Sequence, residues 1–121
     1  MAWQIIHCDE FNSEFQCFPE ELQDELLAHE ALLAEFGPAL GRPTVDTLKG
    51  SKLANLKELR FSWQRQPYRF LFVFDPKRRA IILVGASKGN DKQFYPRMSN
   101  IAEQRYATFL RKEEENERNA Q

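Results

Sequence analysis

Three apolar segments that follow one another closely constrain the fold of this chain most. Residues 56–63, 68–75 and 80–87 are rich in β-branched and aromatic side chains, a composition typical of strands. The connections between them, at 64–67 and 76–79, are four residues long. Hairpin turns fit such lengths, whereas parallel strands need crossovers of about a dozen residues or more. The sequence therefore predicts an antiparallel three-stranded meander.

Alternation within the first hairpin predicts its register. If Arg65 and Gln66 form the turn, six large apolar side chains share one face of the hairpin. Arg60 and Arg69 then lie diagonally on the other face, where Glu58 is two residues from Arg60 along the strand. A slip of one residue would scatter the aromatic rings over both faces, so the pattern favours this pairing. The six apolar residues are Leu59, Phe61, Trp63, Tyr68, Phe70 and Phe72.

Helical patterns lie on both sides of the meander. After a short strand at residues 3–8, a short helix and a longer one are expected before Gly37, which stops the second helix. Residues 39–54 show little periodicity and are predicted to form an extended connection, and Pro96 opens a final helix. The elements together predict an α+β fold. Two N-terminal helices and one C-terminal helix pack on a small antiparallel sheet made of the N-terminal strand and the meander.

Length and residue types exclude several classes of protein. A chain of 121 residues is too short for a two-domain enzyme, and no apolar run approaches the roughly 20 residues of a membrane span. Cys8 and Cys17 cannot build a disulfide framework, and no Cys/His spacing predicts a zinc site, so no metal or cofactor is expected. The N-terminus lacks the layout of a signal peptide, which makes a reducing cytoplasm the expected location. One domain is predicted over residues 1–112, followed by an acidic, frayed tail over 113–121.

The net charge of −1 conceals a strong polarity along the chain. Residues 1–36 carry nine acidic side chains and no Lys or Arg, whereas residues 37–112 carry sixteen basic and five acidic ones, a net charge of +11. Residues 113–121 add −3. A basic segment of this size is expected to attract phosphate, although a solvated surface of mixed charge would have the same composition.

Most catalytic signatures are absent, and what is left is a set of cations beside a sheet. Arg60 and Arg69 project from one face of the first hairpin, and Lys88 follows the third strand of the meander. An arginine in the middle of a strand needs a partner, which is either a salt bridge to Glu58 or a phosphodiester whose developing charge it stabilises. Tyr95, in the loop before the last helix, could stack on a base or pack in the core.

Five motifs of this chain resemble the HigB-like branch of the RelE/ParE toxin superfamily, the toxins of bacterial type II toxin-antitoxin modules. The resemblance implies a RelE-like, compact microbial-ribonuclease-type fold, whose better-studied members cut mRNA in the ribosomal A site and arrest translation. It also implies a helix-turn-helix antitoxin from the same operon, operator DNA as a partner only of the toxin-antitoxin complex, and no membrane. The motifs are GPALGRP at 37–43, DTLKGS at 46–51, ANLKELR at 54–60, PYR at 67–69 and FDP at 74–76.

The resemblance also implies roles for individual residues. Arg60, Arg69 and Lys88 match basic catalytic positions of the family, and Glu58 competes with a lysine for the role of general base. Cleavage in the family is attack of the RNA 2′-hydroxyl on the adjacent phosphorus without a metal. The general acid stays open, with Tyr95 and Tyr106 as candidates. The residues expected to contact RNA are Lys49, Lys52, Lys57, Lys92 and Tyr95.

Two other functions are compatible with the same fold. A ParE-like protein would inhibit gyrase without cutting RNA, and a degenerate or prophage-borne copy would be a non-toxic interaction module. Discrete cuts in mRNA would indicate the nuclease, whereas DNA damage without cuts would indicate the inhibitor.

Overall fold

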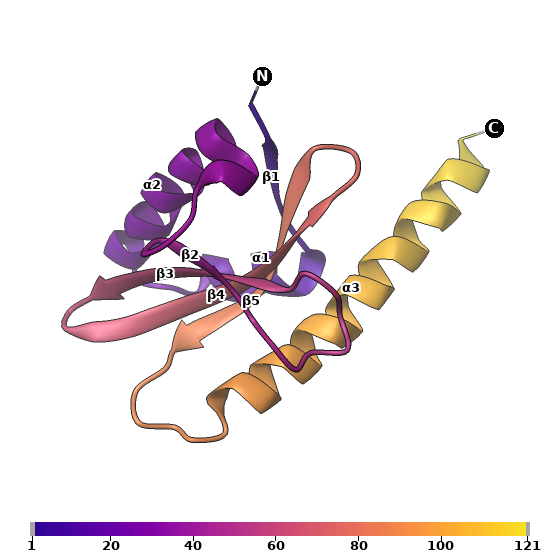
Figure 1. Cartoon of the computed structure of the whole chain (residues 1–121). Coiled ribbons are helices and arrows are strands. Elements are labelled where there is room, and N and C mark those ends of the chain that lie inside the picture. Colours follow the sequence, from indigo (N-terminus) through magenta and orange to yellow (C-terminus); the bar gives the residue numbers. More distant parts are fainter. Residues whose placement is uncertain (1, 121) are drawn as a thin grey trace.

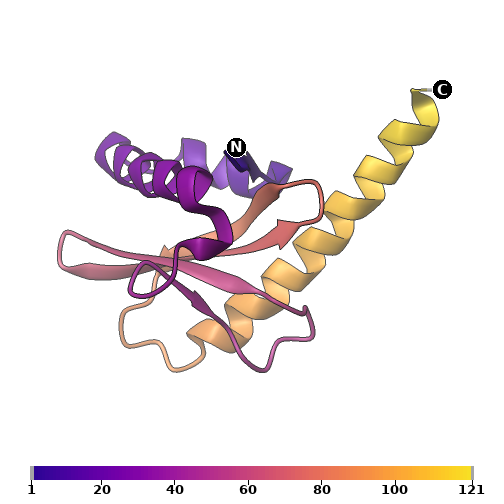
Figure 2. The same ribbon diagram turned by 45° about the horizontal axis from the view of Figure 1, so that its top comes forward.

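The computed structural model describes residues 2–120 and has an α+β architecture with a five-stranded sheet between two layers of helix (Figures 1 and 2). The predicted fold class is confirmed. None of the helices in the described part of the chain is long and apolar enough to span a membrane. The elements are β1 (Gln4–His7), α1 (Asp9–Gln16), α2 (Glu20–Phe36), the 3-10 turn η1 (Gly37–Ala39), β2 (Val45–Thr47), β3 (Lys57–Trp63), β4 (Gln66–Asp75), β5 (Arg79–Ser87) and α3 (Phe94–Asn119).

The strand order is β1-β5-β4-β3-β2, and it corrects two predictions. The meander of β3, β4 and β5 is antiparallel as expected, but β1 pairs with β5 in parallel, so the sheet is mixed. The long chain between β1 and β5 permits this crossover. The second correction is β2, which lies within the predicted connection and pairs with β3 through Val45 and Leu59. Three residues are too few for a periodic signal.

The first hairpin turns one residue earlier than predicted, and its register is therefore shifted. Gln64 and Arg65 have positive φ values of 49° and 62°, the backbone of a primed hairpin turn that matches strand twist. The pairing differs from the expected one by two residues, so Arg60 lies directly opposite Arg69 instead of diagonal to it. Because side chains alternate with a period of two, the shift leaves every residue on its predicted face.

The two faces of the sheet are covered by different helices (Figure 2). On one face, α1 and α2 pack on the aromatic side of the hairpin, where Phe11 meets Phe70 at a ring-centroid distance of 5.9 Å. Gly85 of β5 leaves room for this packing, because a Cβ there would lie 2.0 Å from the Phe70 ring. On the other face, α3 buries Phe94 and Met98. The acidic helices thus lie on the side of the sheet opposite to Arg60 and Arg69.

The last helix extends through the segment that was predicted to fray. It continues to Asn119, and its C-terminal half is fastened to the β4–β5 hairpin by Arg79. The Arg79 guanidinium donates two hydrogen bonds of 2.7 Å to Glu113 and one of 2.8 Å from Nε to Asp75. Arg79 is only 9% exposed, so this network is shielded from water on one side. The acidic tail is therefore the end of a helix, held by a buried cation.

We expect Glu113→Gln to make stability less dependent on pH. Hydrogen bonds from Arg79 lower the pKa of Glu113 below its ordinary value, so the carboxylate stabilises the fold above the unfolded pKa, about 4.3, and loses this effect as pH falls. The wild type should melt a few degrees above Glu113→Gln at pH 7, an effect of up to about 1 kcal/mol, and the gap should close at pH 3. Thermal melts measure it, with the exposed Glu114→Gln as control. A gap of equal size at both pH values would contradict this role.

Candidate active site

A buried glutamate lies at the centre of the polar cluster on the α3 side of the sheet. Glu58 projects from β3, and its side chain is 5% exposed. Its Oε1 accepts a 2.9 Å hydrogen bond from the Tyr95 hydroxyl and lies 3.2 Å from Arg69 Nε and 3.4 Å from Arg60 Nε. One carboxylate oxygen therefore gathers side chains from β3, β4 and α3.

The two arginines of this cluster face each other directly across β3 and β4. Like charges in directly opposite positions of paired strands repel, and the Glu58 carboxylate beside both of them offsets this repulsion. Arg69 is the deeper of the two, with 13% of its side chain exposed against 34% for Arg60. The Arg60 side chain is therefore partly exposed to solvent, while Arg69 lies largely buried beneath it.

Tyr95 and Lys88 complete the cluster from the end of β5 and the start of α3. The Lys88 ammonium lies 5.2 Å from the centroid of the Tyr95 ring, and the Lys88 N–H donates to the Pro67 carbonyl at 2.7 Å. Burial, and then the hydrogen bond to the negative Glu58, raise the pKa of Tyr95, with Arg69 acting in the opposite direction. Tyr95 therefore keeps its proton at neutral pH and can act as a donor.

A second carboxylate that the sequence did not indicate borders the cluster. Asp46 of β2 lies 3.8 Å from Arg60 and 3.1 Å from the exposed Arg42, whose hydrogen bond lowers the pKa of Asp46. Asp46 was missed because its strand was not predicted. Its position beside Arg60 follows only from the pairing of β2 with β3.

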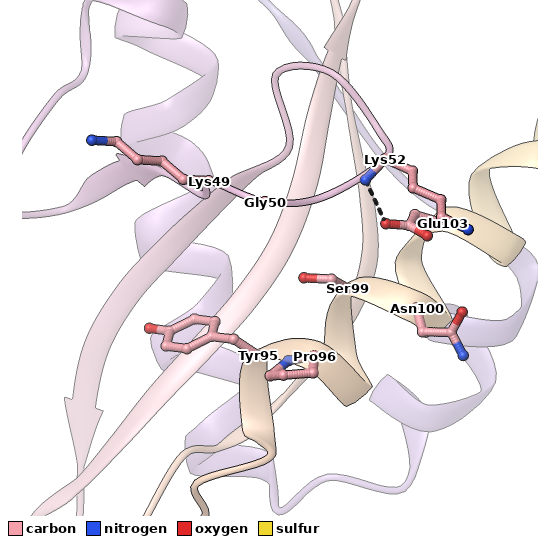
Figure 3. A pocket seen from close by; sticks show the side chains of 8 residues that line it. All are labelled: Lys49, Gly50, Lys52, Tyr95, Pro96, Ser99, Asn100 and Glu103. Atoms are coloured by element: carbon pink, nitrogen blue, oxygen red, sulfur yellow. Dashed lines mark hydrogen bonds between the residues drawn. The ribbon is translucent and has the colours of Figure 1, made fainter.

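The lysines predicted to contact RNA do not all lie together. Lys49 and Lys52 line a hollow of about 380 Å³ between the β2–β3 loop and α3, together with Tyr95 (Figure 3). Lys57 instead donates a 2.8 Å hydrogen bond to Thr47 at the β2 edge of the sheet. Lys92 is exposed in the loop before α3. Two of the four predicted lysines thus line the same hollow as Tyr95, with their side chains directed away from its ring (Figure 3).

Tyr106 lies away from the cluster, although the sequence left it open as an acid. Eleven residues of α3 separate it from Tyr95, about 16 Å along the axis, and it borders a different hollow together with Arg79 and Glu113. Within residues 2–120, no group of three or more His, Cys, Asp or Glu side chains is placed to hold a metal ion.

Comparisons with known proteins find a matching family and two relatives that are described as putative toxins. Residues 13–107 match the family described as "Phage derived protein Gp49-like (DUF891)". The chain is 42% identical over 92 residues to "Putative toxin HigB2" of Mycobacterium tuberculosis, covering 74% of this chain and 46% of that protein, so it spans about half the length of that relative. It is 46% identical over 83 residues to "Putative toxin HigB3" of the same organism, covering 68% of this chain and 71% of the relative.

Solved structures with the same fold have far lower sequence identity. The archaeal RelE of a RelE-RelB complex from Pyrococcus horikoshii matches with a TM-score of 0.58 and 19% identity, over 75% of this chain and all of that one. The isolated E. coli RelE toxin matches with a TM-score of 0.58 and 10% identity, over 83% and 99% of the two chains. The fold is therefore RelE-like. The family model and the two HigB-type sequence relatives show that this chain belongs to the Gp49-like family.

Proposed function

We propose that this chain is the toxin of a type II toxin-antitoxin module and that it cuts mRNA on the ribosome. The observation that carries the proposal is the cluster around Glu58, which joins two arginines, a lysine and a protonated tyrosine on one face of the sheet. Such a set can bind a phosphodiester, neutralise charge on its oxygens and supply a proton. The acidic helices α1 and α2 cover the opposite face, so they do not repel RNA from the cluster.

The two arginines are assigned to the scissile phosphate. Guanidinium groups present several N–H donors in a plane and keep their charge at any physiological pH, which suits them to the oxygens of a phosphate. Arg60 is the more exposed and would meet the phosphate first, while Arg69 supports it from below. Both would stabilise the negative charge that grows on the non-bridging oxygens during attack.

Glu58 is assigned a positioning role, although the sequence had made it a candidate for the general base. Its Oε1 is buried and already occupied by the Tyr95 hydroxyl and the two guanidinium groups. A carboxylate held in this way orients its neighbours better than it accepts a proton from a substrate. Lys88, which lies beside the Tyr95 ring, is then assigned the role of taking the proton from the RNA 2′-hydroxyl.

The proposed reaction transfers the phosphoryl group within the RNA. The 2′-oxygen loses its proton to Lys88 and forms a bond to the adjacent phosphorus, the bond from phosphorus to the 5′-oxygen breaks, and the 5′-oxygen takes a proton from Tyr95. The products are a 2′,3′-cyclic phosphate and a 5′-hydroxyl end. Tyr95 can supply this proton because its phenol is protonated at neutral pH.

An antitoxin from the same operon is the proposed partner that controls this activity. The archaeal structure is a complex of RelE with RelB, which supports a protein partner for this chain too. An acidic segment of a helix-turn-helix antitoxin would be drawn to the basic residues around Arg60 and Lys88 and would screen them from RNA. Operator DNA would be bound only by the toxin-antitoxin complex.

We expect Arg60→Ala and Lys88→Ala each to abolish growth arrest when the chain is induced in a host without the antitoxin. Loss of a group that stabilises transition-state charge, as Arg60 is proposed to do, or of the general base, the role proposed for Lys88, costs about 100- to 1000-fold in rate, enough to relieve arrest. Arg111→Ala, which removes an equally positive but exposed side chain of α3, should stay toxic. Colony counts after induction measure the effect, and thermal melts of the purified variants show that they fold. If both variants stopped growth as fully as wild type, the site assignment would be wrong.

Tyr95→Phe tests the proton donor, because it keeps the ring and removes only the hydroxyl. We expect kcat for cleavage of ribosome-bound mRNA to fall about 100-fold or more, with little change in KM. Because burial and Glu58 raise the pKa of Tyr95, the wild type should show no loss of rate from this group up to about pH 9. A Tyr95→Phe variant with the wild-type kcat would exclude Tyr95 as the acid.

A further inference from the structure

The loop between β2 and β3 carries two of the predicted RNA-binding lysines. It is closed at its base by a 2.9 Å hydrogen bond from the Leu48 N–H to the Leu56 carbonyl. Leu48 and Leu53 pack against the core, so both flanks of the loop are anchored by apolar contact. Lys49 and Lys52 are exposed between these anchors. The part that would meet RNA is therefore the part with the fewest apolar contacts.

A single carboxylate of α3 holds this exposed part. Glu103 Oε2 accepts a 2.7 Å hydrogen bond from Ser51 Oγ. The same oxygen accepts a 3.0 Å hydrogen bond from the Lys52 N–H, which Figure 3 shows. Ser51 Oγ in turn accepts a 3.0 Å hydrogen bond from the Leu53 N–H. One oxygen atom thus binds Ser51 and Lys52 directly, and Leu53 is linked to it through the Ser51 hydroxyl. The sequence spacing gave Glu103 no such role, because its partners are about 50 positions away.

We propose that Glu103 is a positioning residue: by binding Ser51 and the Lys52 N–H it holds the loop that carries Lys49 and Lys52 as one wall of the hollow, whose other wall starts at Tyr95. This inference rests on the proposed function, since it assigns the hollow to the RNA beside the scissile phosphate. The wall on α3 is formed by Tyr95, Pro96, Ser99, Asn100 and Glu103 itself. Tyr95 also binds Glu58, so the hollow and the catalytic cluster share a residue.

The hydrogen bonds to Glu103 would preorganise the β2–β3 loop for binding RNA. An exposed loop that must be ordered when a ligand binds costs conformational entropy, which is subtracted from the affinity. With Glu103 in place, the backbone at Ser51 and Lys52 is already fixed, and the lysines need only adjust their side chains. Removing the tie should therefore weaken binding of RNA and leave the chemistry at Arg60 and Tyr95 unchanged.

Three variants test the proposal. Glu103→Ala removes the acceptor, Glu103→Gln keeps one amide oxygen that can accept both hydrogen bonds, and Gln104→Ala alters an exposed neighbour on α3 as a control. For Glu103→Ala we expect KM for ribosome-bound mRNA to rise about tenfold with kcat within about twofold of wild type, the scale of one or two lost hydrogen bonds. Glu103→Gln should recover most of the wild-type KM, and Gln104→Ala should equal wild type.

Hydrogen exchange of the Lys52 amide gives a second readout that does not need the activity. In Glu103→Ala this amide should exchange about tenfold faster than in wild type, while the amides of the sheet stay protected. If the wild type cut no RNA, the proposed function would fail, and unchanged exchange at Lys52 would separately overturn the tie. The inference would also be overturned if Glu103→Ala kept the wild-type KM, if kcat fell while KM stayed constant, or if Glu103→Gln were as impaired as Glu103→Ala.

Discussion

The repulsion between Arg60 and Arg69 is the constraint on which the site depends. The register of the first hairpin places these two cations directly opposite each other, an arrangement that is unfavourable unless a negative charge lies between them. Glu58 supplies that charge from the same face, and its burial makes the attraction stronger than it would be in water. Tyr95 then donates a hydrogen bond to the same Glu58 oxygen that pairs with both arginines, and it links the cluster to α3. A phosphate entering here meets guanidinium groups that are already oriented.

The fold separates the charges that the sequence carries in succession. The acidic first third forms α1 and α2 on one face of the sheet, and the acidic end of α3 lies about 27 Å along the helix from Tyr95. Ion pairs join the layers at several places, among them Arg79 with Glu113 and Arg105 with Glu14, each at 2.7 Å. The net charge of −1 therefore says little about any one surface, because acidic and basic residues are sorted onto different sides.

The sequence was most informative where periodicity is strong and least informative where pairing is set at a distance. The meander followed from composition and short connections, and the faces of the hairpin followed from alternation. The register did not, because Gln64 and Arg65 lack the Gly or Asn that usually marks a primed turn. The parallel pairing of β1 with β5 joins residues as far apart in the sequence as Gln4 and Arg79, and no local pattern indicates such a pairing. The helical tail depends on Arg79, which lies 34 positions before its partner Glu113.

The same division applies to the site. The structure places Arg60, Arg69 and Glu58 together. The sequence suggested this, because all three lie on one face of the predicted hairpin. Asp46 and Glu103 had no local signal, since the first required the strand β2 and the second required the packing of a loop on α3. Lys57 carried the same signal as Lys49 and Lys52 but lies in β3 and donates to Thr47 of the edge strand β2. Charge and composition thus indicate which residues can bind phosphate, and tertiary pairing decides which of them meet.

The central claim is that the cluster around Glu58 cuts mRNA, and mapping of RNA 5′ ends tests it most directly. The chain is induced briefly in a host without the antitoxin gene, and the 5′ ends of all transcripts are compared with those from cells that express Arg60→Ala. The account predicts discrete new 5′-hydroxyl ends at a fixed position within codons of translated reading frames, absent in the variant. Growth arrest by the wild type without new RNA ends, or with DNA breaks in their place, would contradict it.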